Sequence, residues 1–203
     1  AEDSDHNPAE AAIHIARYAL ARPFVQGCRV LDISCGEGYG SRLMARDWGA
    51  ASVVGVDISE ESIAAAQRAF KADNLEFCVG EAERLTDAFN SGSFDVAVSL
   101  ETIEHVADPV QFLRGLRHSV RPDGVIIISC PNDRWYYPSA SESNPYHRRK
   151  FTEEEFRCMV TSVLGEPDVW LLGTAMSGFI NWPVTAEASD STSQGLASLA
   201  DLP

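Results

Sequence analysis

The sequence lacks paired cysteines. Its cysteines are odd in number, and none of them forms a Cys-x-x-Cys spacing: Cys28, Cys35, Cys78, Cys130 and Cys158. This scatter argues against a disulfide framework and against a zinc site built on cysteine pairs. It favours reduced thiols in a cytoplasmic protein.

Positive charge is also scarce. The 16 Lys and Arg residues stand against 30 Asp and Glu residues, which gives a formal net charge of −14. This balance argues against a protein that coats nucleic acid. The one basic cluster, His147-Arg148-Arg149-Lys150, is interpreted as a solvated surface turn.

Long apolar runs are missing too. None reaches the length of a membrane span, and the N-terminus has no signal-peptide pattern. We therefore expect a cytoplasmic protein without membrane insertion. With 203 residues, 45% of them hydrophobic, the chain can bury one sizeable core.

What the chain does have is an alternation of apolar strands and helices. Runs rich in Val and Ile predict strands at 28–33, 52–57, 75–79, 94–100, 125–129 and 169–172. Capping residues predict helices that start at Pro8 and after Ser59, Asp108 and Thr152, and a further helix is expected through Trp48. The predicted fold is α/β, a Rossmann-like, doubly wound and mainly parallel sheet flanked by helices.

The domain organisation follows from composition. We expect one domain over residues 1–183, with its first helix running to about Ala21 and a turn at 121–124. From Thr185 the sequence turns to Ala, Ser, Thr and Asp. Residues 184–203 are therefore interpreted as a loose tail or a truncated continuation.

A glycine-rich turn follows the first predicted strand, with the spacing Gly36-x-Gly38-x-Gly40. Glycines let the backbone approach a ligand, and the next helix offers free N–H groups to a carboxylate. A dinucleotide fingerprint would need glycine where Ser41 stands. A nicotinamide-dependent dehydrogenase is therefore the weaker of two nucleotide-binding alternatives.

Several segments resemble the motifs of class I S-adenosylmethionine-dependent methyltransferases. They cover roughly residues 28–131 in the order of that family: 30–38, 54–59, 80–83, 94–106 and 121–124. Glu81 stands where the family more often has Asp, and Asp123 replaces a usual Gly. The resemblance implies S-adenosylmethionine as cofactor and methyl transfer as the reaction.

The resemblance also implies roles for the first strand and its turn. Cys35, Gly36 and Gly38 would hold the methionine end of the cofactor. Asp32 would order this turn or meet the amino group through water. Leu100, at the end of the fourth predicted strand, would present its carbonyl to the same amino group.

The adenosine end would be bound after the second and third predicted strands. Asp57 would accept hydrogen bonds from the ribose hydroxyls, and Ile58 would pack on the adenine. Glu81 would accept a hydrogen bond from the adenine amino group, with the backbone N–H of Ala82 on a ring nitrogen.

His105 and Glu101 are the candidate catalytic residues because they leave the fourth strand where an acceptor should lie. Histidine is the commonest general base near neutral pH, and a hydroxyl acceptor needs one. The alternative is that both residues only shape the cofactor pocket. Trp135, Tyr136 and Tyr137 could contact an acceptor or form a packed lid.

Two subfamilies share further residues with this chain. The Glu101-Thr102-Ile103-Glu104-His105 segment and the Asn144-Pro145-Tyr146-His147 segment are similar to bacterial methyltransferases associated with surface-glycan synthesis. We therefore expect a small-molecule or glycan acceptor, modified at a hydroxyl, and no metal. A non-catalytic subunit that only binds the cofactor is a further alternative.

The second subfamily methylates the terminal 2′-hydroxyl of small RNAs and binds a divalent metal. Its pattern is matched by Glu101, Glu104, His105 and His147. Carboxylate and imidazole ligands can hold a metal against two sugar hydroxyls. The net charge of −14 argues against this RNA hypothesis.

Overall fold

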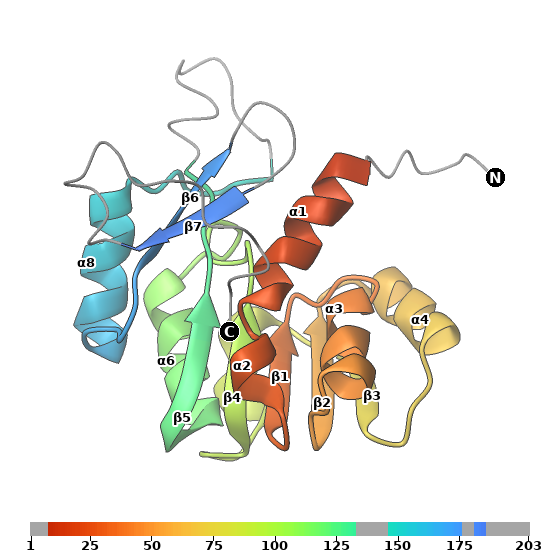
Figure 1. The fold of residues 1–203 in the computed structure, drawn as a ribbon. Coiled ribbons are helices and arrows are strands. Elements are labelled where there is room, and N and C mark those ends of the chain that lie inside the picture. Colours follow the sequence, from red (N-terminus) through yellow and green to blue (C-terminus); the bar gives the residue numbers. More distant parts are fainter. Residues whose placement is uncertain (1–7, 133–145, 176–180, 186–203) are drawn as a thin grey trace. The chain divides into compact units, whose positions relative to one another are not determined.

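The computed structural model describes residues 8–132, 146–175 and 181–185 (Figure 1). The chain divides into two compact units. One unit is Phe24–Glu166, and the other combines Ala1–Pro23 with Pro167–Pro203. The prediction of one domain over residues 1–183 stays a prediction, and residues 186–203 lie outside the described part.

The larger unit is built on a five-stranded sheet in the order β3-β2-β1-β4-β5, with every pair parallel (Figure 1). The strands are β1 (Arg29–Ile33), β2 (Ser52–Asp57), β3 (Leu75–Val79), β4 (Phe94–Ser99) and β5 (Val120–Ile128). The chain leaves β1 towards β2 and β3, then returns to place β4 on the other side of β1. In open α/β sheets, ligands commonly bind at the carboxyl ends of the strands beside such a reversal of strand order. The predicted fold class is confirmed.

Helices flank this sheet and cover its apolar strands. They are α3 (Tyr39–Arg42), the π-helix η1 (Leu43–Asp47), α4 (Glu60–Ala69), the 3-10 helix η2 (Ala82–Arg84), α5 (Leu85–Ala88), α6 (Pro109–Ser119) and α8 (Glu153–Leu164). Helix α4 packs on β2 and β3, and α6 packs on β4 and β5. Phe112, Leu113 and Leu116 of α6 are fully buried, which explains the apolar spacing of that helix.

The predicted helix starts agree with the structure. Ser59 accepts a hydrogen bond from the N–H of Ser62, and Thr152 with Glu155 forms a complete capping box. At Asp108, the capping box that the spacing of Asp108 and Gln111 would allow is only half present. Its side chain accepts from the N–H of Gln111, but its own N–H donates to Glu83, from a distant part of the chain.

The turn predicted at 121–124 is a bulge inside β5. Phe94 pairs with Val120 and Val96 pairs with Val125, so residues 121–124 lie opposite Asp95 alone. The ladder resumes on both sides of this insertion, which is why the structure has one strand where a turn and a strand were expected.

The smaller unit contains α1 (Pro8–Ala19) and an antiparallel pair, β6 (Leu171–Ala175) with β7 (Asn181–Thr185). The short helix α2 (Arg22–Val25) spans the boundary between the units. Pro23 does not stop this helix, because the first turn has no partner for a backbone N–H. Strand β7 was not predicted. It contains Pro183, which fits because both strands of a two-stranded sheet lie at an edge.

Two further expectations concern absences. None of the five cysteines forms a disulfide in the structure. Within the described ranges, no helix is both long enough and apolar enough to span a bilayer.

Candidate functional site

The glycine-rich turn after β1 depends on left-handed backbone. Ser34, Gly36 and Gly38 have φ angles of 59°, 55° and 81°. A Cβ at Gly38 would lie 2.5 Å from the ring of Phe77, so only glycine fits there. A Cβ at Gly36 would meet no atom within 4 Å. The turn therefore packs tightly on one side and leaves open space beside Gly36.

Asp57, at the end of β2, holds this turn from the neighbouring strand. Its Oδ2 accepts a hydrogen bond from the N–H of Gly36 at 2.8 Å, and its Oδ1 accepts one from the N–H of Ser59 at 2.9 Å. Each oxygen has two acceptor positions, so the carboxylate can accept further hydrogen bonds from a ligand.

Asp32, in the centre of the sheet, is fully buried and accepts a hydrogen bond from the Ser41 hydroxyl at 2.5 Å. Ser41 belongs to α3, so Asp32 links β1 to the helix that follows the turn. Gly55 on β2 makes room for this contact, because a Cβ there would lie 2.8 Å from the Ser41 oxygen. The sequence signal for Ser41 was its position in the glycine-rich turn, where it argued against a dinucleotide fingerprint but did not predict the bond to Asp32.

Cys35, within the turn, has a buried thiol. Its side chain is buried, and burial raises the pKa of the thiol well above its usual range. The carboxylates of Asp32 and Asp57 raise this pKa further. Because the thiolate is the reactive form, a raised pKa disfavours a nucleophilic role for Cys35, whose side chain packs with Ile63, Ala66 and Phe77.

Apolar side chains are exposed where the adenine is expected. The side chain of Ile58 is 70% exposed and that of Val79 is 50% exposed, although both are apolar. Both line an open pocket of about 450 Å³ together with Glu81 and Leu85. Glu81 is the N-cap residue of η2 and Ala82 its first residue, so the pocket combines apolar walls with an exposed carboxylate.

Glu101 follows β4 in an uncommon backbone conformation, with a φ angle of 53°. The Glu101 carboxylate accepts a hydrogen bond from the Ser129 hydroxyl at 2.6 Å. The Glu101 N–H donates to the oxygen of that hydroxyl at 3.1 Å. Ser129 was not predicted as a site residue. Beside it, Leu100 is buried and its carbonyl accepts the Thr102 hydroxyl at 3.3 Å.

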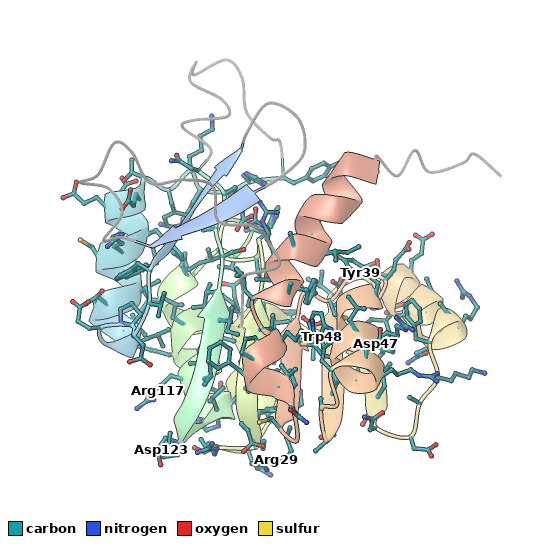
Figure 2. All side chains as sticks on the ribbon, in the orientation of Figure 1. Arg29, Tyr39, Asp47, Trp48, Arg117 and Asp123 are labelled. Carbon is teal, nitrogen blue, oxygen red and sulfur yellow. The ribbon has the colours of Figure 1, made fainter. Side chains whose placement is uncertain are left out.

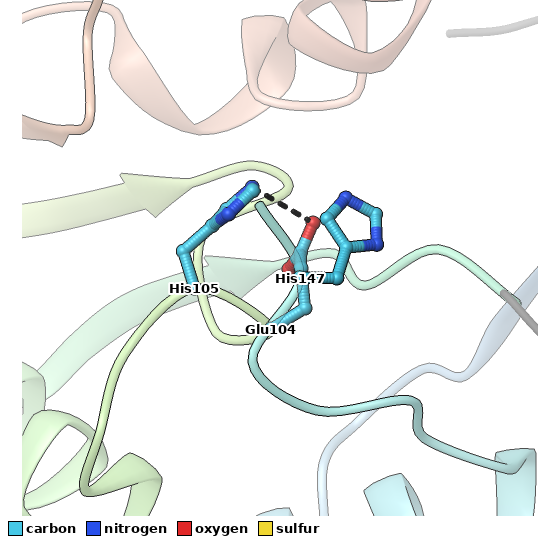
Figure 3. Close-up of side chains that lie close together, drawn as sticks. All are labelled: Glu104, His105 and His147. Carbon is cyan, nitrogen blue, oxygen red and sulfur yellow. Dashed lines mark ion pairs between the residues drawn. The ribbon is translucent and has the colours of Figure 1, made fainter. Parts of the chain in front are cut away.

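His105 lies in a cluster with Glu104 and His147 (Figure 3). The ligand atoms of these three residues lie within 4.8 Å of one another, and Glu104 is 1% exposed. The Nδ1 of His105 is 2.9 Å from the carbonyl of Tyr146. A carbonyl only accepts, so Nδ1 carries the proton and Nε2 faces Glu104 at 3.7 Å.

The fold therefore places the predicted residues at the carboxyl ends of the strands. Gly36 follows β1, Asp57 ends β2, Glu81 follows β3, and Leu100 with the Glu101–His105 segment follows β4. Glu101 is not among the three clustered ligand residues, and one of its carboxylate oxygens accepts a hydrogen bond from the Ser129 hydroxyl. Trp135, Tyr136 and Tyr137 lie outside the described residues.

These features define the class of protein. The parallel order β3-β2-β1-β4-β5, with a glycine turn after β1 and an acid at the end of β2, is the Rossmann-like fold of class I methyltransferases. A family model described as a methyltransferase domain matches residues 24–175. The chain belongs to this methyltransferase domain family.

Similar proteins agree with this assignment. The chain is 42% identical over 123 residues to the ubiquinone biosynthesis O-methyltransferase of Azorhizobium caulinodans, which covers 59% of this chain and 46% of that protein. The match with this chain covers less than half the length of these curated relatives.

Solved structures show the fold. A protein from Pyrococcus horikoshii OT3 has a TM-score of 0.66 at 23% identity, over 90% of this chain and 92% of that chain. A possible histamine N-methyltransferase from Thermotoga maritima also has a TM-score of 0.66, at 20% identity, over 88% of this chain and 85% of that chain.

Proposed function

We propose that this chain transfers a methyl group from S-adenosylmethionine to a hydroxyl of a small-molecule acceptor. The observation that carries the proposal is the position of Asp57. Its carboxylate bridges the N–H groups of Gly36 and Ser59 and lies beside the exposed side chain of Ile58. A carboxylate next to an exposed apolar side chain suits a ribose joined to an adenine.

The other residues of the site fit the same cofactor. Open space beside Gly36 admits a ligand close to the backbone, and the Ile58 and Val79 side chains offer an apolar slot for a base. Glu81 lies in the same pocket and can accept a hydrogen bond from an exocyclic amino group. When bound, the cofactor supplies an electrophilic methyl group, so alignment of the acceptor carries much of the rate.

His105 is the proposed general base. The carbonyl of Tyr146 holds the proton on Nδ1, which leaves Nε2 able to accept the proton of a hydroxyl. Glu101 is proposed to shape the acceptor side through its bond to Ser129. The printed name O-methyltransferase of the relatives supports a hydroxyl acceptor. None of the relatives described above supports the narrower hypothesis of a glycan acceptor.

Metal-assisted methylation of RNA ends is a second candidate function. It is favoured by the proximity of Glu104, His105 and His147, which provides three of the four ligands that this hypothesis needs. The fourth, Glu101, is bound to Ser129. The net charge of −14 also opposes an RNA partner, so we prefer the small-molecule acceptor.

The proposal is tested by calorimetric titration with S-adenosylhomocysteine on the wild type, Asp57→Asn and Asp73→Asn. An amide at position 57 cannot accept from both backbone groups and the ribose, so we expect its affinity to fall about 100-fold. Asp73 is exposed and is not among the residues of the site, so its variant should match the wild type. Absence of binding to the wild type would refute the cofactor assignment.

A second calorimetric titration, with manganese in place of S-adenosylhomocysteine, distinguishes the two candidate functions. Manganese is added alone to the wild type and to His147→Ala. Binding that His147→Ala abolishes would favour the metal-assisted reaction. If the wild type and His147→Ala bind manganese equally, or if neither binds it, the metal-free small-molecule proposal stands.

A further inference from the structure

Glu83 connects the turn of residues 81–84, where the adenine is expected and which we call the adenine turn, to the loop that carries His105. It lies in η2, two residues after Glu81, and the N–H of Arg84 closes this turn by donating to the carbonyl of Glu81 at 3.0 Å. The Glu83 carboxylate then reaches across to the start of α6. Its Oε1 accepts the N–H of Asp108 at 2.7 Å, and its Oε2 accepts the N–H of Ala107 at 3.2 Å.

A third contact joins the same two elements. The side-chain amide of Gln111, in the first turn of α6, donates to the carbonyl of Glu83 at 2.9 Å. Gln111 therefore does not complete the capping box with Asp108, and Glu83 takes over that function from 25 residues away. The adenine turn and the N-terminus of α6 are held as one hydrogen-bonded body.

The loop between β4 and α6 is bound on its other side by the segment that carries His147. The carbonyl of Ala107 accepts a hydrogen bond from the Arg149 guanidinium at 3.2 Å. Both backbone polar groups of Ala107, its N–H and its C=O, are therefore hydrogen-bonded. The carbonyl of Glu104 accepts the N–H groups of Arg148 and Arg149 at 2.9 and 3.2 Å. His105 completes the connection through the carbonyl of Tyr146.

We infer that Glu83 is a positioning residue, which orders the His105 loop when the adenine turn is occupied. The inference rests on the proposed function. A ligand that fixes Glu81 and Ala82 also fixes the Glu83 carboxylate, and through it the N–H groups of Ala107 and Asp108. By thermodynamic reciprocity, an acceptor that orders this loop would strengthen cofactor binding.

The test compares Glu83→Ala and Glu83→Gln with the wild type by NMR. Glu154→Ala is the matched control, because it removes an exposed acid that makes none of these hydrogen bonds. In the free protein, Glu83→Ala should speed hydrogen exchange of the Ala107 and Asp108 amides at least about 10-fold, since both lose a charge-assisted bond. Glu83→Gln keeps one acceptor oxygen and should have an intermediate effect.

The second measurement follows the imidazole Hε1 resonance of His105 during titration with S-adenosylhomocysteine. The resonance is identified by its loss in His105→Gln. We expect a ligand-induced shift in the wild type and in Glu154→Ala, and its loss in Glu83→Ala, while the affinity for the ligand changes less than about fivefold. A residue that only stabilised the fold would lower the thermal midpoint without uncoupling this response.

Two outcomes would overturn the inference alone. One is unchanged exchange at Ala107 and Asp108 in Glu83→Ala, and the other is a His105 shift that persists in this variant. Failure of the wild type to bind S-adenosylhomocysteine would instead overturn the proposed function together with the inference. If Glu83→Ala does not fold, the intermediate values expected of Glu83→Gln decide in the same way.

Discussion

Gly36 and Gly38 share a left-handed backbone but differ in their surroundings. A Cβ at Gly38 would lie 2.5 Å from the Phe77 ring and 2.9 Å from the Ala66 side chain, whereas a Cβ at Gly36 meets nothing within 4 Å. Phe77 and Ala66 belong to a buried cluster with Cys35 and Ile63. The core therefore requires glycine at position 38, whereas at position 36 only the positive φ and, under the proposed function, the cofactor favour glycine.

This difference predicts distinct effects for two alanine substitutions. Gly38→Ala should lower the free energy of unfolding by about 3 kcal/mol, because strain at positive φ adds to overpacking. Gly36→Ala should cost only about 1 kcal/mol. Its Cβ would occupy the open space beside the turn, so affinity for S-adenosylhomocysteine should fall. Urea denaturation and calorimetry measure the two quantities, and equal losses of stability would contradict the prediction.

At the scale of elements, α6 and α8 begin in different ways. The first turn of α8 is closed by its own residues, since Thr152 accepts from the N–H of Glu155 and the Glu155 carboxylate accepts from the N–H of Thr152. The first turn of α6 needs Glu83 from another part of the chain. Only a cap closed within its own first turn, as in α8, can be recognised from adjacent residues.

Thr152→Ala should therefore destabilise the protein locally and by a modest amount. Loss of the N-cap oxygen is expected to cost about 1 kcal/mol, seen as a lower urea midpoint with an unchanged denaturant slope. Thr152→Ser keeps the hydroxyl and is the control. The prediction is wrong if the alanine and serine variants have the same midpoint.

At the scale of the whole sheet, one carboxylate joins three strands at their amino ends. Asp95 on β4 accepts hydrogen bonds from the backbone and guanidinium of Arg29 on β1, and from Arg121 on β5. Figure 2 shows Arg29 and Asp123 at this end of the sheet. The hydrogen bond from the Arg29 guanidinium is the main reason that the pKa of Asp95 falls from its ordinary 3.8 to about 2.

This lowered pKa predicts a pH dependence of stability. The ionised carboxylate stabilises the folded state above pH 4, and this contribution is lost as the pH falls from about 4 to about 2. Solvent screening limits it to on the order of 1 kcal/mol, since the Arg29 and Arg121 side chains are 48% and 45% exposed. The difference in unfolding free energy between wild type and Asp95→Asn should therefore shrink over this range. A constant difference would contradict the assignment.

The sequence by itself determined strands β1 to β4, the starts of α1, α4, α6 and α8, and the position of the glycine-rich turn. Apolar runs mark β1 to β4 because a buried parallel strand needs apolar residues on both faces. Ser59 and Thr152 mark helices because a cap bonds to a backbone group two or three residues away. Asp57 and Glu81 could be placed at one edge because parallel strands end on the same side.

Tertiary structure alone decided which side chains meet across the chain. Ser41 bonds to Asp32, Ser129 to Glu101, and Glu83 to Asp108, and none of these pairs follows from local spacing. The resemblance to known methyltransferases grouped Glu101 and His147 with His105, but only the fold showed that Glu101 bonds to Ser129 and that His147 lies beside His105 and Glu104. The physical reason is that local spacing fixes contacts within one turn or strand, whereas contacts across tens of residues depend on the path of the chain through the sheet.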